Sequence, residues 1–291
     1  MITVVGSSNT DFTVRVRELP FVGETVLGSD FFTSGGGKGA NQAACIARLG
    51  GKVNLIANIG SDVFGDQRIK DLESFGVNTK YVKRDRQHPS GVAFILVDKK
   101  GKNLIAVSPG SNSFLKLNDI VKAAESIKKS DVVLIQLEIP TEAVRAAVYL
   151  AKRFDKAVIL NPAPARPLNK DILSKIDILV PNELEASELG GPRLLLNRGV
   201  GCVIITLGKK GVLLINKKGS RPFKARQVKV VDTTCAGDAF CGAFALGLDK
   251  GRPIEKAIEF ANITAALTCS KLGAQCSLPT LKQVTHTFKE G

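Results

Sequence analysis

One stretch decides how this chain folds: Val231-Asp232-Thr233-Thr234-Cys235-Ala236-Gly237-Asp238-Ala239-Phe240. It follows a strand-like run, residues 227–231, and leads into an apolar segment rich in glycine and alanine, residues 239–248. A strand, a turn of small residues and a helix start, in that order, point several backbone N–H groups at one spot. The helix dipole adds about half a positive charge there. The sequence therefore predicts a phosphate site at the start of this helix.

Asp238 lies in the first turn of the predicted helix, beside the predicted phosphate. A carboxylate next to a phosphate is unfavourable unless it takes a proton from the group that attacks the phosphorus. Aspartate is also a common helix cap, which would give the same position a purely structural role. The local sequence supports the two interpretations equally.

The rest of the chain alternates between strand-like and helix-like segments. Apolar runs typical of buried strands occur at residues 1–6, 53–59, 132–137, 158–161, 178–180, 203–207 and 212–215. Helical spacing of apolar residues occurs at 39–49 and 64–75, after a cap at Asn118, and after a cap at Thr141. Continuous apolar strands that alternate with helices predict a doubly wound α/β fold, with a mainly parallel sheet covered on both faces.

Four further segments do not fit this alternation and predict a small separate sheet. Phe12, Val14 and Val16 alternate with polar residues, and further strand-like runs lie at 24–32, 91–97 and 103–107. We expect a single α/β domain over residues 1–291, with a β lid formed from about 12–33 and 90–108. The apolar face and strand edges of such a lid could be covered by another copy of the chain.

Composition excludes several classes of protein. Of 291 residues, 44% are hydrophobic and 23% are charged, which is ordinary for a soluble globular protein. No apolar run approaches the roughly 18 residues that span a bilayer, and the start of the chain lacks the basic flank of a signal peptide. We therefore expect no membrane association.

Cysteines and charge narrow the partners further. Six cysteines without a Cys-x-x-Cys pair, with only two histidines, argue against a zinc site and indicate reduced thiols in a cytoplasmic protein. The net charge is +14, but the basic residues are scattered and no tryptophan accompanies them. Nucleic-acid sites usually combine a basic patch with aromatic residues, so we expect no nucleic-acid partner.

A second glycine-rich stretch, Ser34-Gly35-Gly36-Gly37-Lys38-Gly39-Ala40-Asn41-Gln42-Ala43, opens another predicted helix. Glycines let a ligand approach the backbone, and Lys38 supplies a positive charge. Taken alone, the stretch fits a flexible loop with a solvated lysine better than a ligand site. It is not a Walker loop, because the Gly-x-x-x-x-Gly-Lys-Ser/Thr spacing is absent.

Together the two glycine-rich stretches resemble the signatures of the ribokinase-like (phosphofructokinase B type) carbohydrate kinases. The turn at 232–238 is similar to that family's Asp-Thr-x-Gly/Ala-Ala-Gly-Asp motif, and the resemblance covers almost the whole chain. It implies an ATP-dependent kinase that phosphorylates D-ribose at the 5-hydroxyl, with Asp238 as general base. The same resemblance implies a homodimer through the β lid. The implied anion hole consists of the amides of Cys235, Ala236 and Gly237.

The resemblance also implies which residues bind sugar and nucleotide. The sugar ligands would be Asn9, Asp11, Gly37, Lys38, Asn41, Glu138 and Asp238. Carboxylates and amides suit a polyol, which offers many hydroxyl donors and acceptors and little apolar surface. The ATP-binding residues would be Asn182, Thr206, Gly208, Ala236, Gly237 and Asn262.

Two cation sites follow from the same resemblance. Asn182 and Glu185 match its Asn-x-x-Glu motif, which positions Mg²⁺ and its waters, and Mg²⁺ usually takes few protein ligands. The alternative for this pair is an acidic helix start without a metal. A monovalent cation, K⁺, would lie near Asp232, Thr234, Thr268, Lys271, Gly273 and Ser277.

Departures from the family's pattern give three more expectations. Lys271 stands where arginine is common and Cys276 where proline is common, and the chain is short between residues 190 and 201, so a helix is expected to be largely missing there. Cys235 replaces the usual Gly or Ala. Because it precedes a helix N-terminus in an anion-binding loop, we expect a lowered thiol pKa, the fastest alkylation of the six cysteines, and protection by ATP.

Two other functions fit the same residues. One is a nucleoside kinase or another sugar kinase of the same family, which would need an apolar slot for a base near the lid. The other is a sugar- or nucleotide-binding regulator without turnover. Asp238 and the Asn-x-x-Glu motif, both intact, argue against the regulator.

Overall fold

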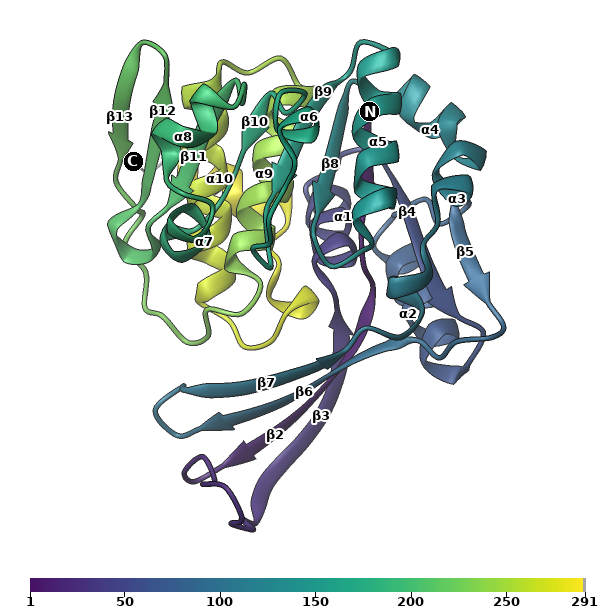
Figure 1. The fold of residues 1–291 in the computed structure, drawn as a ribbon. Helices are drawn as coiled ribbons and strands as arrows, with labels where there is room; N and C mark the ends of the chain where they lie inside the picture. Colours follow the sequence, from purple (N-terminus) through teal and green to yellow (C-terminus); the bar gives the residue numbers. More distant parts are fainter. Residues whose placement is uncertain (290–291) are drawn as a thin grey trace.

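A nine-stranded sheet forms the centre of the computed structural model, which describes residues 1–289 (Figure 1). Residues 290–291 of the expected domain lie outside that range. The strand order is β13-β12-β11-β10-β9-β8-β1-β4-β5, in which all neighbours from β11 to β5 pair in parallel and β12 and β13 pair antiparallel. The strands are β1 Ile2–Val5, β4 Val53–Gly60, β5 Val82–Asp85, β8 Val132–Gln136, β9 Ala157–Asn161, β10 Ile178–Leu179, β11 Cys202–Thr206, β12 Val212–Asn216 and β13 Gly219–Phe223.

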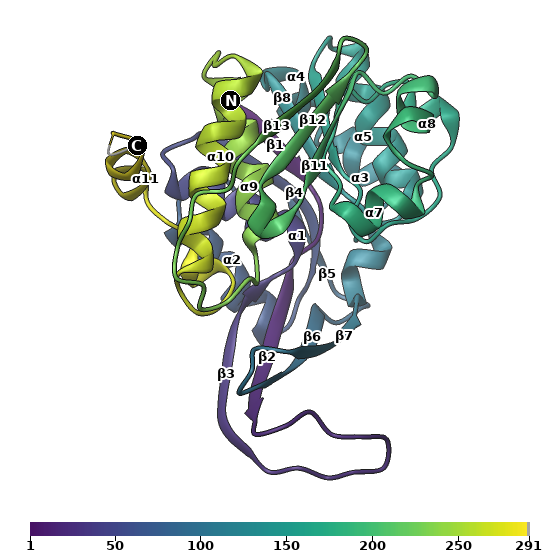
Figure 2. The ribbon, with the colours of Figure 1, turned by 90° about the vertical axis from the view of Figure 1, so that its left-hand side faces the viewer.

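Helices cover both faces of this sheet, and each face has its own buried core. On one face lie α1 Lys38–Arg48, α2 Val63–Ser74, α9 Ala236–Asp249, α10 Ile254–Cys269 and α11 Leu281–Lys289 (Figure 2). On the other lie α3 Leu117–Lys122, α4 Ala124–Lys129, α5 Thr141–Arg153, α6 Lys170–Leu173, α7 Glu183–Glu188 and α8 Pro192–Asn197. Three 3₁₀ turns complete the elements: η1 Gly110–Phe114, η2 Gly208–Lys210 and η3 Gln275–Ser277. The predicted doubly wound α/β fold is confirmed.

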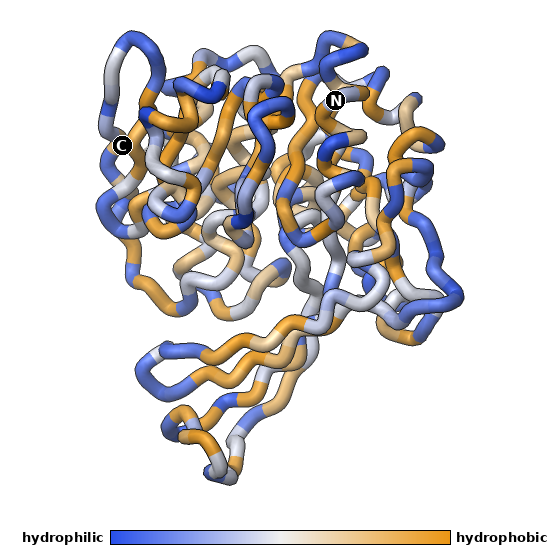
Figure 3. Tube along the Cα trace, in the orientation of Figure 1, coloured by the Kyte–Doolittle hydropathy of each residue, from blue (hydrophilic) through white to orange (hydrophobic). Residues whose placement is uncertain are grey.

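A second, four-stranded sheet projects from the body at the carboxyl ends of the central strands (Figures 1 and 2). Its order is β3-β2-β6-β7, with β2 Asn9–Val16, β3 Gly28–Gly36, β6 Gly91–Asp98 and β7 Asn103–Ser108. On the face opposite Asp11, the ring of Phe12 lies 6.2 Å from that of Phe31, 5.4 Å from that of Phe94 and 5.3 Å from that of Phe64 in α2. Phe31 is 64% exposed and Phe94 58% exposed, so apolar side chains of this sheet are open to solvent. Apolar residues run along its strands (Figure 3).

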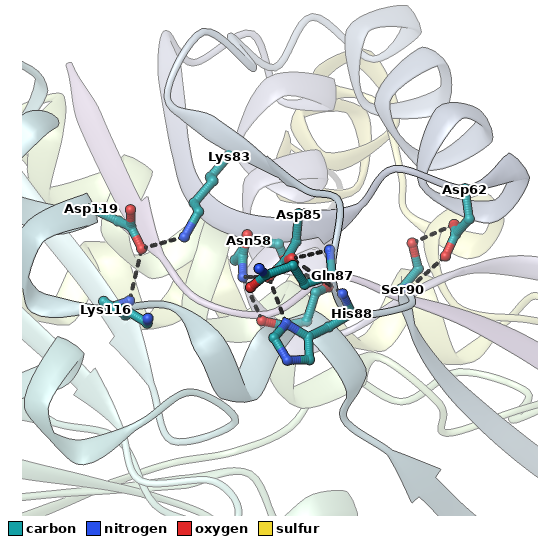
Figure 4. Close-up of polar contacts among 10 residues, drawn as sticks. Asn58, Asp62, Lys83, Asp85, Gln87, His88, Ser90, Lys116 and Asp119 are labelled. Carbon is teal, nitrogen blue, oxygen red and sulfur yellow. Dashed lines mark hydrogen bonds and ion pairs between the residues drawn. The ribbon is translucent and has the colours of Figure 1, made fainter.

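Two aspartates anchor the root of the second sheet to the central one (Figure 4). Both carboxylate oxygens of Asp62 accept hydrogen bonds from Ser90, one from the backbone N–H and one from the hydroxyl, each at 2.7 Å. Asp85 accepts from the Asn58 amide at 2.9 Å and from the Gln87 backbone at 2.9 Å. Burial alone would raise the pKa of Asp85, but these hydrogen bonds hold it well below its usual range. The segment entering β6 is therefore fixed to the ends of β4 and β5.

Several sequence-based boundaries were wrong. The strand expected at 24–32 is β3, Gly28–Gly36, and Thr141 begins α5 and does not cap it. Residues 227–231 are not a strand, because the chain leaves the sheet after β13 and Val230 and Val231 are exposed without a partner strand. The segment after residue 116 forms two helices, and the first begins at Leu117, before the predicted cap Asn118. Between residues 190 and 201 a helix is present, the six-residue α8, which begins at a proline.

Candidate active site

Asp238 lies in the first turn of α9 and is 6% exposed. One of its carboxylate oxygens accepts a hydrogen bond from Asn41 Nδ2 at 2.9 Å, and the other accepts one from Gln42 Nε2 at 3.0 Å. Both donors lie in the first turns of α1, the helix opened by the other glycine-rich stretch. The two stretches singled out in the sequence therefore meet at this carboxylate.

A polar cavity of about 250 Å³ lies in front of Asp238. It is lined by side chains of α1 and α7 together with the N-terminus of α9, among them Lys38, Asn182, Glu185, Cys235, Ala236, Gly237 and Asp238. A side-chain carbon added at Gly237 would meet no atom within 4 Å, so the backbone of the first turn of α9 is open to this space. The predicted base, anion hole and magnesium residues share one cavity.

Lys38 stands among carboxylates at the edge of the polar cavity. Burial alone would lower the pKa of its ammonium, but Asp238, Glu138 and Glu185 raise it above the usual value. Its backbone N–H donates to Glu138 Oε2 at 3.0 Å, and the Ser7 hydroxyl donates to the same oxygen. A fixed positive charge therefore lies beside the predicted phosphate position.

The predicted sugar residues do not share one cavity: Asp238 and Lys38 line the polar cavity, whereas Gly37 and Asn41 line neither it nor the two cavities that follow. Asn9, Lys38 and Glu138 line a lateral cavity of about 560 Å³ beside β7. Asp11 lines a cavity of about 620 Å³ under the second sheet. Asp11 is 8% exposed, and burial, assisted by the negative charge of Glu138, raises its pKa to about 7. Gly36 makes room for it, because a side-chain carbon there would lie 2.1 Å from Asp11 Oδ1.

A cavity of about 500 Å³ on the other side of α9 adjoins the polar cavity. We call it the apolar cavity, since Val212, Val228, Val230, Phe240, Ala265 and Ala266 contribute much of its wall. Thr206, Gly208, Ala236, Gly237 and Asn262 also line it, so the structure brings these five predicted ATP residues together. The sixth, Asn182, lines the polar cavity instead.

Asn182 and Glu185 cap the start of α7 reciprocally. Asn182 Oδ1 accepts from the Glu185 backbone at 2.8 Å, and Glu185 Oε2 accepts from the Asn182 backbone at 2.9 Å. The second carboxylate oxygen of Glu185 remains for another ligand, and burial raises the pKa of this group. Within residues 1–289, no cluster of three or more His, Cys, Asp or Glu side chains could hold a metal. This donor set fits Mg²⁺ held largely by water and phosphate.

Asp232 links the loop before α9 to the segment after α10. Its two carboxylate oxygens accept from the backbones of Thr234 and Gly273, each at 2.9 Å. Ser277 is buried and its hydroxyl donates to the Ala274 carbonyl at 2.7 Å. The structure thus brings Asp232, Thr234 and Gly273 together, while Thr268 and Lys271 share the turn that ends α10.

The expectation for Cys235 was wrong in its direction. The residue takes the left-handed conformation, with φ 66°, and packs against the core that contains α1 and α9. Burial raises the pKa of its thiol well above the usual value, and the Asp238 carboxylate raises it further. These effects outweigh the field of the helix N-terminus, so the pKa of the thiol is raised and not lowered. Cys235 lines the polar cavity, and its rate of alkylation and protection by ATP stay predictions.

Sequence reasoning gave no role to the side chains that surround Asp238 from behind. Gln42 binds the carboxylate directly, and Asn161 Oδ1 accepts a second hydrogen bond from the same amide at 3.2 Å. Gln136 and Gln275 contact the amides of Gln42 and Asn41. Gln42 lies inside the second glycine-rich stretch, next to Asn41, which is the one signal in the sequence that pointed to it.

Comparisons with known proteins show the family of this chain. Residues 1–281 match the model of the pfkB family of carbohydrate kinases. It is 39% identical to the ribokinase of Haemophilus influenzae, over 99% of this chain and 98% of that protein. It is 38% identical to a deoxyribokinase of Salmonella typhimurium, over 97% and 96%. The structure of the Arabidopsis thaliana ribokinase complexed with ribose and ATP superposes with a TM-score of 0.90 at 32% identity, over 99% and 98% of the two chains.

A membrane-spanning role finds no support: the described part of the chain contains no helix with the length and apolar character to cross a bilayer.

Proposed function

Because this chain belongs to the pfkB family of carbohydrate kinases, we propose that it transfers the γ-phosphoryl group of ATP to the 5-hydroxyl of D-ribose. The observation that carries the proposal is the position of Asp238. It is buried, bound by two amides of α1, and set where the polar cavity meets the N-terminus of α9. An acceptor hydroxyl can reach the carboxylate there while its target phosphate lies against the helix.

Asp238 acts as general base. It takes the proton of the 5-hydroxyl as the oxygen attacks the phosphorus, and its carboxylate keeps unshared electron pairs for this after accepting from Asn41 and Gln42. The backbone amides of Cys235, Ala236 and Gly237 hold the phosphoryl oxygens as charge builds on them. Asn182 and Glu185 would hold Mg²⁺ with its waters, and the ion would supply positive charge next to the triphosphate.

The acceptor lies between the two sheets. Asn9, Asp11, Gly37, Lys38, Asn41 and Glu138 hydrogen-bond its hydroxyls, and their carboxylates and amides match the donors and acceptors of a polyol. The second sheet acts as a lid that excludes water, which would otherwise compete as acceptor. The purine of ATP lies in the apolar cavity beside Asn262, with Thr206 and Gly208 near the phosphates.

A second acceptor, 2-deoxyribose, is favoured by the deoxyribokinase relative. In a coupled assay of ADP release, we expect kcat/KM to be highest for ribose, lower for 2-deoxyribose, and lowest for fructose, adenosine, inosine and cytidine. A higher kcat/KM for a nucleoside than for ribose would mean that the nucleoside, and not ribose, is the acceptor. No ADP release with any member of the panel would favour a binding protein without turnover.

Potassium should raise the rate of ribose phosphorylation relative to a sodium buffer. A cation near Asp232, Thr268 and Ser277 would order the loop of the anion hole without touching substrate, since Asp232 already binds Thr234 and Gly273. The test compares rates in K⁺, Na⁺ and a bulky organic cation at one ionic strength, in the wild type and in Asp232→Ala. Equal rates in the three salts would remove this site, and the Asp232→Ala variant should show no preference among them.

The apolar face of the second sheet is the proposed dimer contact. Phe12, Phe31 and Phe94 form its centre, and every residue of β7 is exposed at its edge, so a second copy could cover both. We expect a dimer in sedimentation velocity and a monomer for Phe94→Glu. Leu194→Glu, a comparable change on α8, should stay dimeric. A wild-type monomer at micromolar concentration would rule out the contact.

The proposed location is the cytoplasm. All six cysteines are free thiols in the structure, and secreted proteins of this size commonly oxidise theirs.

A further inference from the structure

Two glutamines lie behind the amides that bind Asp238. Neither of them lines any of the cavities described above. Gln136, at the end of β8, is 0% exposed, and Gln275, in η3, is 3% exposed. Gln136 Nε2 donates to the Oε1 of Gln42, and Gln275 Nε2 donates to the Oδ1 of Asn41 at 3.1 Å. Each glutamine therefore binds the oxygen of an amide whose nitrogen binds the carboxylate.

The orientation of all these amides is forced by groups that can only accept. An ionised Asp238 accepts from Asn41 Nδ2, which turns the Asn41 oxygen towards Gln275 and leaves that residue only a donor role.

On the Gln42 side of the carboxylate, Asn161 Nδ2 donates to the Val180 carbonyl at 2.9 Å. Its oxygen therefore faces Gln42 Nε2, at 3.2 Å, and the Gln42 oxygen is left for Gln136. The amides on the Asn41 side and those on the Gln42 side are therefore consistent with a single arrangement of donors and acceptors.

Two glycines make room for the glutamine amides. A side-chain carbon added at Gly6 would lie 1.9 Å from Gln136 Oε1, and one added at Gly35 would lie 2.4 Å from Gln275 Oε1. Both separations are far below van der Waals contact, so no other residue type fits at either glycine while the glutamine stays in place. Both glycines therefore leave the space that the glutamine amides occupy.

We propose that Gln136 and Gln275 are positioning residues for phosphoryl transfer: they hold the amides of Gln42 and Asn41 in the orientation that donates to Asp238. Neither touches the substrate. Two directed hydrogen bonds stabilise the ionised carboxylate, which is the form that accepts the proton of the hydroxyl. The inference rests on the proposed role of Asp238 and extends it to residues from two other parts of the chain.

Other charged and titratable groups surround the same carboxylate. Lys38 attracts it, whereas Asp11 and Glu185 repel it, and the thiols of Cys45, Cys235 and Cys241 face it from α1 and α9. None of these groups is changed by substituting Gln136 or Gln275, so a difference between variants reports on the amides alone.

The test is the pH dependence of the single-turnover rate of ADP formation at saturating ribose and MgATP. Saturating ribose removes any effect of Asp11 on sugar binding. Gln275→Met keeps the length of the side chain but removes the donor, so the Asn41 amide can rotate. We expect the acid limb of the pH–rate profile to move to higher pH by about one unit. At pH values below the limb, this shift lowers the single-turnover rate roughly tenfold. Above the limb the rate should stay within a few-fold of the wild type.

Gln275→Glu should move the limb further than Gln275→Met. The introduced carboxylate accepts only, so it draws the Asn41 nitrogen to itself and turns the Asn41 oxygen towards Asp238. Gln136→Met should repeat the smaller shift through Gln42. Gln67→Met, an exposed glutamine of α2, is the matched control and should leave the profile unchanged. Thermal unfolding shows which variants fold, and Gln275→Met decides alone if the carboxylate variant does not.

Two results would overturn the inference: a wild-type acid limb in folded Gln275 and Gln136 variants, or an equal loss of rate at every pH, which is what a purely structural role gives. Asp238→Asn, measured beside them, separates the inference from the function. If that variant keeps the wild-type rate, the role of Asp238 is wrong. If it loses the rate while the glutamine variants keep their limb, only the positioning role is wrong.

Discussion

Replacing Asp238 with asparagine should lower kcat for ribose about 10²- to 10⁴-fold. The amide fills nearly the same space between Asn41 and Gln42 but cannot take a proton from the 5-hydroxyl. The other residues that line the sugar and nucleotide cavities are unchanged, so KM for ribose and for ATP should stay within a few-fold. The measurement is steady-state kinetics with a coupled ADP assay.

The control for this variant is Asp66→Asn, an exposed aspartate of α2 that forms an ion pair with Arg84. Its kcat should match the wild type, and binding of MgATP should be the same in all three proteins by calorimetry. If Asp238→Asn turns over within a few-fold of the wild type, the carboxylate has only a structural role at the start of α9.

Asp11→Asn should raise KM for ribose about 10- to 100-fold with little change in kcat. A carboxylate that accepts hydrogen bonds from hydroxyls contributes roughly 1.5–3 kcal/mol, and the amide keeps the shape but loses the charge. Gly36 leaves room for the carboxylate in the native protein and for the amide of similar size in the variant. The result is read from kcat and KM measured separately at pH 8.

The same residue should give ribose binding a dependence on pH. Burial and Glu138 raise the pKa of Asp11 to about 7 in the free protein, so it becomes protonated as the pH falls below neutral. KM for ribose should therefore rise below about pH 7 in the wild type and stay flat in Asp11→Asn. A flat wild-type profile between pH 6 and 8 would mean that Asp11 does not bind the sugar as a carboxylate.

Stability should change with pH in a matching direction. Because the folded-state pKa of Asp11 lies above its unfolded value of 3.8, the folded protein binds this proton more tightly. The contribution of Asp11 to stability therefore falls as pH rises from about 4 through 7. Asp11→Asn should raise Tm more at pH 8 than at pH 5, when both proteins are free of sugar and nucleotide.

The local sequence predicted the elements but misplaced some of their ends. Continuous apolar runs located most strands of the central sheet and alternating runs located those of the second sheet, because strand burial leaves a pattern in the residues themselves, but β5 and β13 were not predicted. Residues 227–231 carry the same pattern, yet they form no strand, because no neighbouring strand pairs with them. Strand pairing is decided between distant segments, and a single run of residues does not record its partner.

The chemical environment of the site residues was harder to predict than which residues the fold brings near Asp238. Cys235 has the neighbours in sequence of an activated thiol, but burial and Asp238 raise its pKa. The two glutamines behind Asp238 lie outside the two glycine-rich stretches, about 100 residues from them in one case and at the far end of the chain in the other. Such contacts depend on which elements the fold brings side by side.

The sequence by itself determined the order of most strands and helices, the two glycine-rich helix starts, and the presence of a carboxylate in the first turn of α9. Each depends on residues within a few positions of one another, where backbone geometry and burial period act directly. Only the tertiary structure decided that Asp238 is bound by Asn41 and Gln42, that Asp11 has a raised pKa, and that Cys235 does too. Burial and long-range neighbours set those properties, and both exist only once the sheets and helices have packed together.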